Sequence, residues 1–459
     1  MIKIDQNRTL QSLLPALERV FEISAQKIHN IEKNWDPGKG APVFTVKGSY
    51  TSRGWTEWTQ GFQYGSAILQ FDATNDRGAL EIGTKGTLRV MPKHISHIGV
   101  HDHGFNTIST CGNILRLLRE EKLPANEWEQ NYFELAVKAS GAVQAARWTE
   151  IGEHQGYVYS FNGPHSLFAD TIRSLRVLAV AHQLGHVLMG EKDRKINLLE
   201  RLLQHAETTA RYNIYYGEGR DAFDVCGRVA HESIFNTNDG SYRCPSTQQG
   251  YSPFSTWTRG LAWILLGYAE ELEFLESLSE EELDHFGGKK KITQAFSSVA
   301  GAVADYYISS TPVDGIPYWD TGAPGLSNLG NYLSRPADPF NEHEPVDSSA
   351  ASIAAQGLVR LGNYLHSKGD TVRGRHYLQS GLTVAARVFD TPYLSTDSSH
   401  QGLILHSVYH RPNGWDYVPE GKKIPCGEAS MWGDYHAREL ALLLWRMAKN
   451  ETYYTFYLK

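Results

Sequence analysis

Helical periodicity recurs along almost the whole chain, and strand-like alternation of apolar and polar residues is scarce. The pattern predicts twelve helices, over residues 9–33, 59–74, 76–91, 103–121, 125–147, 168–184, 193–212, 256–275, 290–309, 347–366, 370–389 and 430–449. The long segments between them, notably 34–58, 213–255, 310–346 and 390–429, are rich in Gly, Pro, Asn and Trp. Segments of this length inside a compact fold usually carry function.

The predicted helices alternate between two kinds. The odd-numbered ones are amphipathic with charged starts, as in GEKDRKINLLERLLQH, whereas the even-numbered ones carry few charges and many small residues, as in VDSSAASIAAQGLVRLGNYL. An amphipathic helix covers a core with one face, but a helix that is apolar or small all round is buried on every side. Six outer helices alternating with six inner helices predict an all-α fold, an (α/α)6 barrel, with residues 1–459 in a single domain.

Composition excludes several classes of partner. The 459 residues have a mean hydropathy of −0.40 and a net charge of −7, spread without long single-sign runs, so we expect no nucleic-acid partner. No polybasic segment and no stretch of about 18 apolar residues is present, so we expect no membrane partner. The N-terminal sequence lacks the apolar run of a signal peptide. Cys111, Cys226, Cys244 and Cys426 lie far apart without metal-ligand spacing, which predicts free thiols and a cytoplasmic protein.

Aromatic residues are frequent, with 11 Trp, 24 Tyr and 17 Phe. They are compatible with a large core, and also with a cleft that binds sugars through their apolar C–H faces. If all inner helices begin at one end of the barrel, the unusual segments before them meet at one cavity. These segments are RGWTEWTQGF, GVHDHGF, NGPHSLFAD, FSTWTRGLAW, EHEPVDSSAA and EASMWGDYH.

Two aspartates stand at predicted starts of inner helices, Asp102 in HDHGF and Asp170 in FADTIRSL. Each could simply be an N-cap, a position that favours Asp. As a pair across a narrow barrel they could instead be catalytic. Two carboxylates in one apolar cleft raise each other's pKa, so that one can stay protonated near neutral pH as a general acid.

The histidines around Asp102 raise the question of a metal. His94, His97, His101 and His103 are close in sequence, but the first two precede the helix, and no HExxH motif or Cys cluster supplies companions. We therefore expect no metal, and we expect His101 or His103 to form a hydrogen bond near Asp102.

Arg259 lies one turn into a predicted helix that also holds Trp257 and Trp263. Two interpretations stay open for it: a structural ion pair, or a clamp for a carboxylate, which the planar guanidinium suits. Two interpretations also stay open for Trp58: packing inside the barrel, or a platform for a sugar ring.

Taken together, the motifs resemble the unsaturated glucuronyl hydrolases, glycoside hydrolase family 88. The resemblance runs through most of the chain, on EWTQGF, HDHGF, the AD of FADTIRSL, TQQG, STWTRGLAW, DGIPYWD, VDSSAASIAAQGL and MWGDYH. The chain departs from the family where a Gly-Gly-Arg stretch often precedes the second aspartate, because it has SLFAD there. The aromatic platform of that loop is therefore either Phe161 or Tyr159. The segments 73–98 and 396–429 do not resemble the family, so the saccharide preference stays open.

The resemblance implies an (α/α)6 barrel with no metal or organic cofactor. It implies a disaccharide-sized unsaturated oligosaccharide as substrate, left by a polysaccharide lyase. It makes Asp170 the general acid/base and Asp102 the second essential aspartate. It makes four further residues substrate contacts: Trp58, His231, Gln249 and Arg259. The implied mechanism is hydration, in which the acid protonates C4 of the double bond, the same carboxylate activates water to attack C5, and the product opens to release the saccharide.

A mixed loop precedes the last predicted helix. It holds the cations or histidines His406, His410, Arg411, Lys422 and Lys423 beside Tyr409, Trp415 and Tyr417. It could be a solvated loop, or it could line the subsite of the departing sugar, where cations would favour sulfate or a second carboxylate.

Three other functions remain open from the sequence. The related unsaturated rhamnogalacturonyl hydrolases share the hydration chemistry but not this full motif set. A barrel-type polysaccharide lyase would depend on a Tyr/His pair, and both residue types are abundant here. A non-catalytic saccharide-binding protein would keep the tryptophans but would need neither aspartate.

Overall fold

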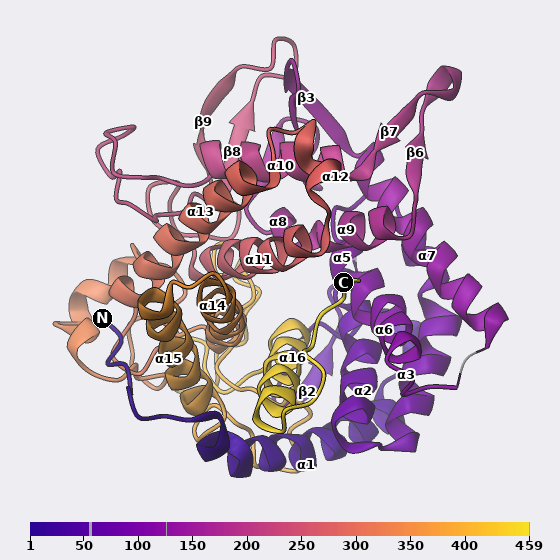
Figure 1. The fold of residues 1–459 in the computed structure, drawn as a ribbon. Coiled ribbons are helices and arrows are strands. Elements are labelled where there is room, and N and C mark those ends of the chain that lie inside the picture. Colours follow the sequence, from indigo (N-terminus) through magenta and orange to yellow (C-terminus); the bar gives the residue numbers. More distant parts are fainter. Residues whose placement is uncertain (55–56, 125, 459) are drawn as a thin grey trace.

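A computed structural model describes residues 1–54, 57–124 and 126–458, and its helices form two concentric rings (Figure 1). The inner ring consists of α2 (Gln60–Thr74), α5 (His103–Thr107) with α6 (Asn113–Arg119), α8 (Thr171–Ser174) with α9 (Arg176–Gln183), α11 (Thr258–Ser277), α14 (Ser348–Ser367) and α16 (Met431–Ala448). Contacts run from α2 to α5, α8, α11, α14 and α16 and back to α2, so the ring is closed.

The outer ring consists of α1 (Leu10–Asn34), α3 (Arg77–Val90), α7 (Glu127–Ala146), α10 (Leu198–Tyr212), α13 (Lys289–Ser310) and α15 (Thr371–Val388). The helices α11, α14 and α16 are buried along nearly their whole length, whereas α1 and α15 bury one face. The predicted (α/α)6 barrel is confirmed, and each ring contains the helices that the alternation in charge assigned to it.

Small residues let the inner helices approach each other closely. A Cβ atom on Gly104 of α5 would lie 2.0 Å from the backbone oxygen of Ser174, so only glycine fits there. The Ser174 hydroxyl accepts from the Gly104 N–H at 2.9 Å and donates to the His101 carbonyl at 2.6 Å. This contact between α5 and α8 brings the starts of the two helices, and with them Asp102 and Asp170, close together.

Nine short strands lie in the described part of the chain, within segments that were predicted mostly as loops. They pair as β1 (Phe44–Val46) with β2 (Ser49–Thr51), β3 (Trp148–Gly152) with β4 (Gln155–Val158), and β6 (Val187–Met189) with β7 (Lys195–Asn197), and as a sheet of order β5 (Ser166–Phe168), β8 (Glu232–Phe235), β9 (Tyr242–Ser246). All pairs are antiparallel. Short helical turns complete the list: α4 (Pro92–Ile95), α12 (Glu280–Asp284), η1 (Pro37–Lys39), η3 (Glu191–Asp193), η4 (Pro324–Leu329) and η5 (Tyr332–Ser334).

Three predicted helices differ in detail from the structure. The helix expected over 168–184 begins only after Asp170, because Phe168 pairs with Glu232 in the sheet, and it is divided at Leu175. The helix expected over 193–212 begins at Leu198, because the β6–β7 hairpin uses the preceding residues. The helix expected over 103–121 contains a π-helical turn, η2 (Ile108–Gly112).

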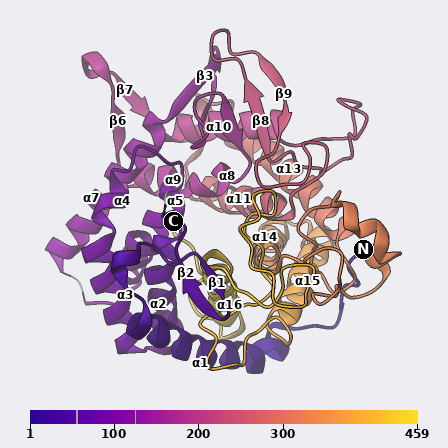
Figure 2. The same ribbon diagram turned by 180° about the vertical axis from the view of Figure 1, so that it is seen from behind.

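The loops gather at the end of the barrel where the inner helices begin. In Figure 2 the β1–β2 hairpin and the orange-to-yellow segment 390–429 lie in front of the inner helices. Backbone contacts join them there, because Phe44 pairs with Ser430 and the Thr45 N–H donates to the Ala429 carbonyl at 2.9 Å.

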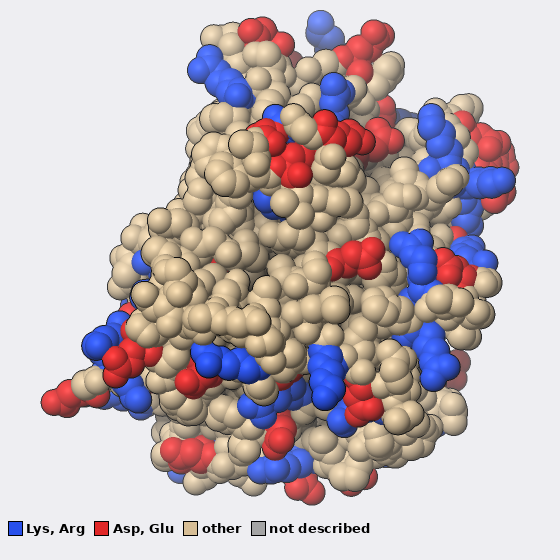
Figure 3. Space-filling model, turned by 90° about the vertical axis from the view of Figure 1, so that its left-hand side faces the viewer, with Lys and Arg blue, Asp and Glu red and all other residues tan. Residues whose placement is uncertain are grey.

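Charged side chains of both signs are mixed at the surface. On the face drawn in Figure 3 they surround a broad uncharged area, and no continuous basic strip crosses that face. No helix in the described part of the chain combines the length and the apolar character that crossing a membrane requires.

Candidate active site

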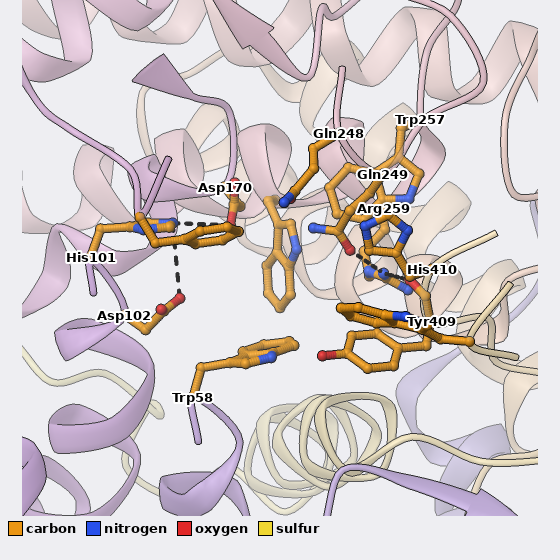
Figure 4. Close-up of a pocket in the computed structure, with 13 residues that line it drawn as sticks. Trp58, His101, Asp102, Asp170, Gln248, Gln249, Trp257, Arg259, Tyr409 and His410 are labelled. Atoms are coloured by element: carbon orange, nitrogen blue, oxygen red, sulfur yellow. Dashed lines mark hydrogen bonds and ion pairs between the residues drawn. The ribbon is translucent and has the colours of Figure 1, made fainter. Parts of the chain in front are cut away.

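A cavity opens at the end of the barrel where the inner helices begin (Figure 4). It is lined by Trp58, His101, Asp102, Phe161, Asp170, Gln248, Gln249, Trp257, Arg259, Trp263, Tyr409, His410 and Trp415. These residues come from the segments before α2, α5, α8, α11 and α16 and from the first turns of α11, so the expected convergence of the helix starts is observed. The segment before α14 contributes indirectly, through the contact of Asp347 with Arg259.

Asp102 and Asp170 occupy the N-cap positions of α5 and α8, but neither side chain caps its helix. By contrast, Asp347 caps α14 through a hydrogen bond from the Ser349 N–H. The interpretation of Asp102 and Asp170 as ordinary N-caps therefore does not describe their side chains. Both carboxylates face the cavity instead, on the side opposite Gln249 and Arg259 (Figure 4).

His101 lies between the two carboxylates. Its Nε2 atom is 3.4 Å from Asp170 Oδ2 and 3.9 Å from Asp102 Oδ1, and its side chain is almost fully buried. The ring packs against Phe161 and Phe168, with centroid distances of 5.8 and 5.6 Å. His103, the alternative partner, bonds to Ser140 Oγ and to the His97 carbonyl. Of the two histidines, His101 is the one near Asp102.

The pKa values of Asp102 and Asp170 are shifted in opposite directions, because His101 acts more strongly on Asp170. Burial raises the pKa of Asp102, as expected for a carboxyl in an apolar cleft. Burial also acts to raise the pKa of Asp170, but the hydrogen bond and charge of His101 outweigh it and lower that pKa. For His101, burial is outweighed by the two carboxylates, which raise its pKa. The expectation that each aspartate raises the pKa of the other therefore fails for Asp170 in the free site, because His101 lies closer to it.

His231, which immediately precedes β8, faces Asp170. Its Nδ1 accepts from the backbone N–H groups of Gln248 and Gln249, at 3.1 and 3.3 Å. An N–H can only donate, so Nδ1 is unprotonated and the proton of the neutral ring lies on Nε2. Burial lowers the pKa of His231, which favours this neutral form. Nε2 lies 4.0 Å from Asp170 Oδ1, and neither atom has another hydrogen-bond partner. A ligand oxygen could bind between them.

Arg259 enters the cavity wall with most of its donors engaged. Nη1 pairs with Asp347 Oδ2 at 3.0 Å and donates to the Val408 carbonyl, while Nη2 donates to Gln249 Oε1 at 3.1 Å and to the Tyr409 carbonyl at 2.7 Å. The structural ion pair considered from the sequence is thus present. Because Gln249 Oε1 accepts from Arg259, the Gln249 amide nitrogen is left as a donor for a ligand.

Aromatic rings form the remaining walls. Trp58 is half-buried on the cavity floor and stacks on Trp432 with a centroid distance of 5.1 Å. Phe161 lines the cavity, whereas Tyr159 lies beneath Arg147, 4.2 Å from the guanidinium carbon to the ring centroid. Between the two aromatic residues considered for this loop, the geometry therefore places Phe161 at the cavity.

The loop before α16 reaches the cavity with its aromatic residues but not with its lysines. Tyr409, His410 and Trp415 line the wall. Lys423 instead pairs with the exposed Glu342 at 2.7 Å, and Lys422 lies over Phe340. Burial lowers the pKa of His410 to about 4, so this ring is neutral at neutral pH. Of the two interpretations left open for this loop, the cationic lining is therefore not found among the described residues that form the cavity.

A metal ion could be held by His101, Asp102 and Asp170, which each offer one ligand atom within 4.8 Å of the others. The same geometry serves proton sharing, since His101 Nε2 already lies near both carboxylates.

Several lining residues were not singled out from the sequence. Gln248 is adjacent to Gln249 in TQQG, and Trp257 and Trp263 flank Arg259, so their motifs were a signal for them. A histidine contact near Asp102 was expected, but the contact of His101 with Asp170 had no such signal, because it depends on the packing of α5 against α8.

Comparisons with known proteins find similar hydrolases. No family model matches the chain. The unsaturated glucuronyl hydrolase of Formosa agariphila is 23% identical over 386 residues, covering 83% of this chain and 78% of that protein. The unsaturated chondroitin disaccharide hydrolase of Streptococcus agalactiae is 23% identical over 401 residues, covering 85% and 82%. The chain is a relative of the unsaturated glucuronyl hydrolases.

Solved structures of such hydrolases share the fold. The unsaturated glucuronyl hydrolase of Bacillus sp. GL1 superposes with a TM-score of 0.70 at 20% identity, covering 96% of this chain and 98% of that one. A variant of the Streptococcus agalactiae hydrolase, solved with dGlcA-GalNAc6S, has a TM-score of 0.64 at 18% identity and covers 99% of both chains. The resemblance inferred from the motifs is thereby confirmed, and so is the barrel.

Proposed function

We propose that the chain is a hydrolase that removes a 4,5-unsaturated uronic acid from the non-reducing end of a lyase-generated oligosaccharide. One barrel domain, residues 1–459, is the active unit. The observation that carries this proposal is the contact of His101 with both Asp102 and Asp170 at the wall of an aromatic cavity. The names of the relatives, which are hydrolases of unsaturated glucuronyl or chondroitin saccharides, supply the substrate class.

The chemistry follows from the charges in the site. In the free protein the lowered pKa of Asp170 favours its carboxylate form, and the raised pKa of His101 favours its protonated form. An anionic uronate adds negative charge and displaces water, which favours protonation of the carboxylates. The His101 proton can then move to Asp170 Oδ2, 3.4 Å away. Asp170 gives this proton to C4 of the double bond, and its carboxylate then takes a proton from the water that attacks C5. The hemiketal opens and releases the saccharide.

The other site residues have supporting roles in this proposal. Asp102 shares the His101 proton. His231, with its proton on Nε2, donates to the uronate or to the attacking water beside Asp170. Trp58 gives the sugar ring an apolar face, and Gln249 donates its amide N–H to the substrate. Arg259 positions Gln249 and adds positive potential for the uronate carboxylate.

The decisive assay follows ultraviolet absorbance with an unsaturated uronyl disaccharide. Hydration removes the double bond, so absorbance should fall. A polysaccharide lyase would instead raise absorbance on an intact polysaccharide, and a binding protein would change neither. Failure to consume any unsaturated disaccharide would refute the proposed function.

A first prediction concerns the site of protonation. In heavy water, the released 4-deoxy sugar should carry solvent deuterium at C4, because the acid protonates that carbon. Nuclear magnetic resonance of the product measures the deuterium. A saturated glucuronide with the same leaving sugar is the control and should remain intact. Product without deuterium at C4 would favour direct displacement by two carboxylates.

A second prediction concerns Arg259. Arg259→Lys keeps the charge but cannot reach Asp347, Gln249 and the Tyr409 carbonyl together. We expect kcat/KM to fall by about tenfold or more, equal to about 1.4 kcal/mol. Arg373→Lys, on the half-exposed face of α15, is the matched control and should be unchanged. An unaffected Arg259→Lys enzyme would leave Arg259 with a structural role alone.

We also propose a cytoplasmic location. The four cysteines, all unpaired in the structure, support a reducing compartment. Immunodetection after cell fractionation tests this location, and recovery of the protein outside the cytoplasm would contradict it.

A further inference from the structure

The segment 316–321 joins the starts of two inner helices. The Thr258 N–H, at the start of α11, donates to the Trp319 carbonyl at 3.1 Å. On the other side the Asp347 N–H, at the start of α14, donates to the Pro317 carbonyl at 2.9 Å. The segment therefore lies between the helix that carries Arg259 and the helix whose N-cap pairs with it.

Asp320, at the end of this segment, is fully buried and does not line the cavity. Its Oδ2 accepts from the Tyr251 N–H at 2.8 Å, and its Oδ1 accepts from the Gly322 N–H at 2.8 Å. Burial raises its pKa to about 6, so the carboxylate form still predominates at neutral pH. Hydrogen bonds to a charged acceptor are stronger than neutral ones, which makes this carboxylate a firm anchor for Tyr251.

Tyr251 closes a turn that carries two cavity residues. Within the turn the Gly250 N–H donates to Thr247 Oγ1 at 2.8 Å, and a Cβ on Gly250 would lie 3.0 Å from Asp320 Oδ2. The N–H groups of Gln248 and Gln249 donate to His231 Nδ1, and the Gln249 side chain accepts from Arg259. Displacing this turn would release His231 and Gln249 at once.

We propose that Asp320 is a positioning residue, whose carboxylate holds the turn 247–251 so that its N–H groups fix the tautomer of His231 facing Asp170. The consequence for turnover rests on the proposed function, whereas the consequence for His231 does not. Outer partners that orient a site histidine through a hydrogen bond commonly change activity by about 10–100-fold when removed.

The test replaces Asp320 by asparagine, which keeps the shape but puts an NH2 group in place of one of the two acceptor oxygens. With ¹⁵N-labelled histidine, His231 of the wild-type protein should show Nδ1 as an acceptor nitrogen and Nε2 as a protonated one, assigned by comparison with His231→Gln. In Asp320→Asn we expect a mixture of tautomers and a kcat/KM lower by about 10–100-fold. The fold is checked by circular dichroism.

Asp314→Asn is the matched control. Asp314 is in the same DGIPYWD motif and accepts from the backbone N–H groups of Ala337 and Ile316, at 3.1 and 3.4 Å, but contacts nothing in the turn. In Asp314→Asn the His231 signals and kcat/KM should stay near the wild-type values. Unchanged His231 signals in folded Asp320→Asn would overturn the proposal.

Two further outcomes are separable. If Asp320→Asn does not fold, Gly250→Ala places a Cβ atom 3.0 Å from Asp320 Oδ2 and so pushes the turn away from its anchor. The same change in His231 is expected, and a wild-type spectrum in this variant would overturn the proposal. If the wild-type protein consumes no unsaturated disaccharide, the proposed function fails, but the His231 spectrum still decides the role of Asp320.

Discussion

Asp170→Asn should reduce kcat on an unsaturated uronyl disaccharide by about 1000-fold, while the fold and substrate binding remain close to wild type. General acid–base catalysis contributes typically about 10²–10⁴-fold, and in the proposed mechanism this one carboxyl performs both proton transfers. The change should be structurally mild, because the Asp170 side chain does not cap α8 and its Oδ1 has no hydrogen-bond partner. The measurement is the loss of ultraviolet absorbance under saturating substrate.

The matched control is Asp76→Asn, at the N-cap of α3, where the Asp76 side chain accepts from the Ala79 N–H far from the cavity. Asparagine is also a good N-cap, so this variant should keep wild-type activity. Asp102→Asn should be strongly impaired too, because it removes one of the two carboxylates that share the His101 proton. If Asp170→Asn kept more than about a tenth of the rate, the effect would be below about 1.4 kcal/mol and the assignment of the acid would be wrong.

The fold could be predicted from the sequence because the two rings differ in composition. The inner helices are surrounded by protein, so a charged surface residue has no place on them, while each outer helix keeps one solvated face. This is visible in α14 and α15, which are neighbours in the chain and in space but differ in burial. The helix predicted over 168–184 begins later than expected because of tertiary structure, since β5 forms only by pairing with a strand more than 60 residues away in sequence.

The candidate site residues that could be predicted are those placed in the cavity by their position at the start of an inner helix. Asp102 and Asp170 were identified because both stand at starts of inner helices, which converge at one end of a barrel. Their pKa values were not predictable, because these depend on distances across the ring. The spacing of His101 from both carboxylates is set by the close contact at Gly104, and no sequence pattern encodes a difference between 3.4 and 3.9 Å.

The lysines of the last long loop show the same limit. Sequence placed them near aromatic residues that do line the cavity, but a loop residue can point either way. Lys423 faces the exposed Glu342 rather than the cavity, and nothing in the local sequence determines this choice. Charge composition of a loop is therefore weak evidence for the charge of the site that the loop borders.

The structure also contains a buried charge network that no motif indicated. Glu439 of α16 accepts from Arg173 Nη2 at 2.9 Å, from Arg176 Nη1 at 3.3 Å and from the Tyr454 hydroxyl at 3.0 Å. Tyr454 belongs to the C-terminal segment and packs beneath Arg116. Glu439 thus joins α8, α9, α16 and the chain's last residues inside the barrel.

Glu439→Gln should lower the free energy of unfolding by about 3–5 kcal/mol, the usual cost of removing one charge from a buried pair. Burial alone would raise the pKa of Glu439, but Arg173 and Arg176 hold it well below its usual range. A depressed pKa in the folded state means that this stabilisation is fully present above the unfolded pKa of about 4.3 and is lost as pH falls toward the folded value. The difference between wild type and variant should therefore be largest at neutral pH and shrink in acid.

Urea unfolding followed by circular dichroism at neutral and acidic pH measures this difference. Glu276→Gln is the matched control, because Glu276 pairs with Lys368 at 2.6 Å on the partly exposed surface, where such a pair contributes less than about 1 kcal/mol. A loss of stability in Glu439→Gln as small as that of the control would mean that another carboxylate neutralises the charge of the buried arginines. Arg173 also pairs with Glu270 at 2.8 Å, and that carboxylate would supply the neutralisation. A loss several times that of the control would instead identify Glu439 as the residue that holds the inner helices and the C-terminal segment together.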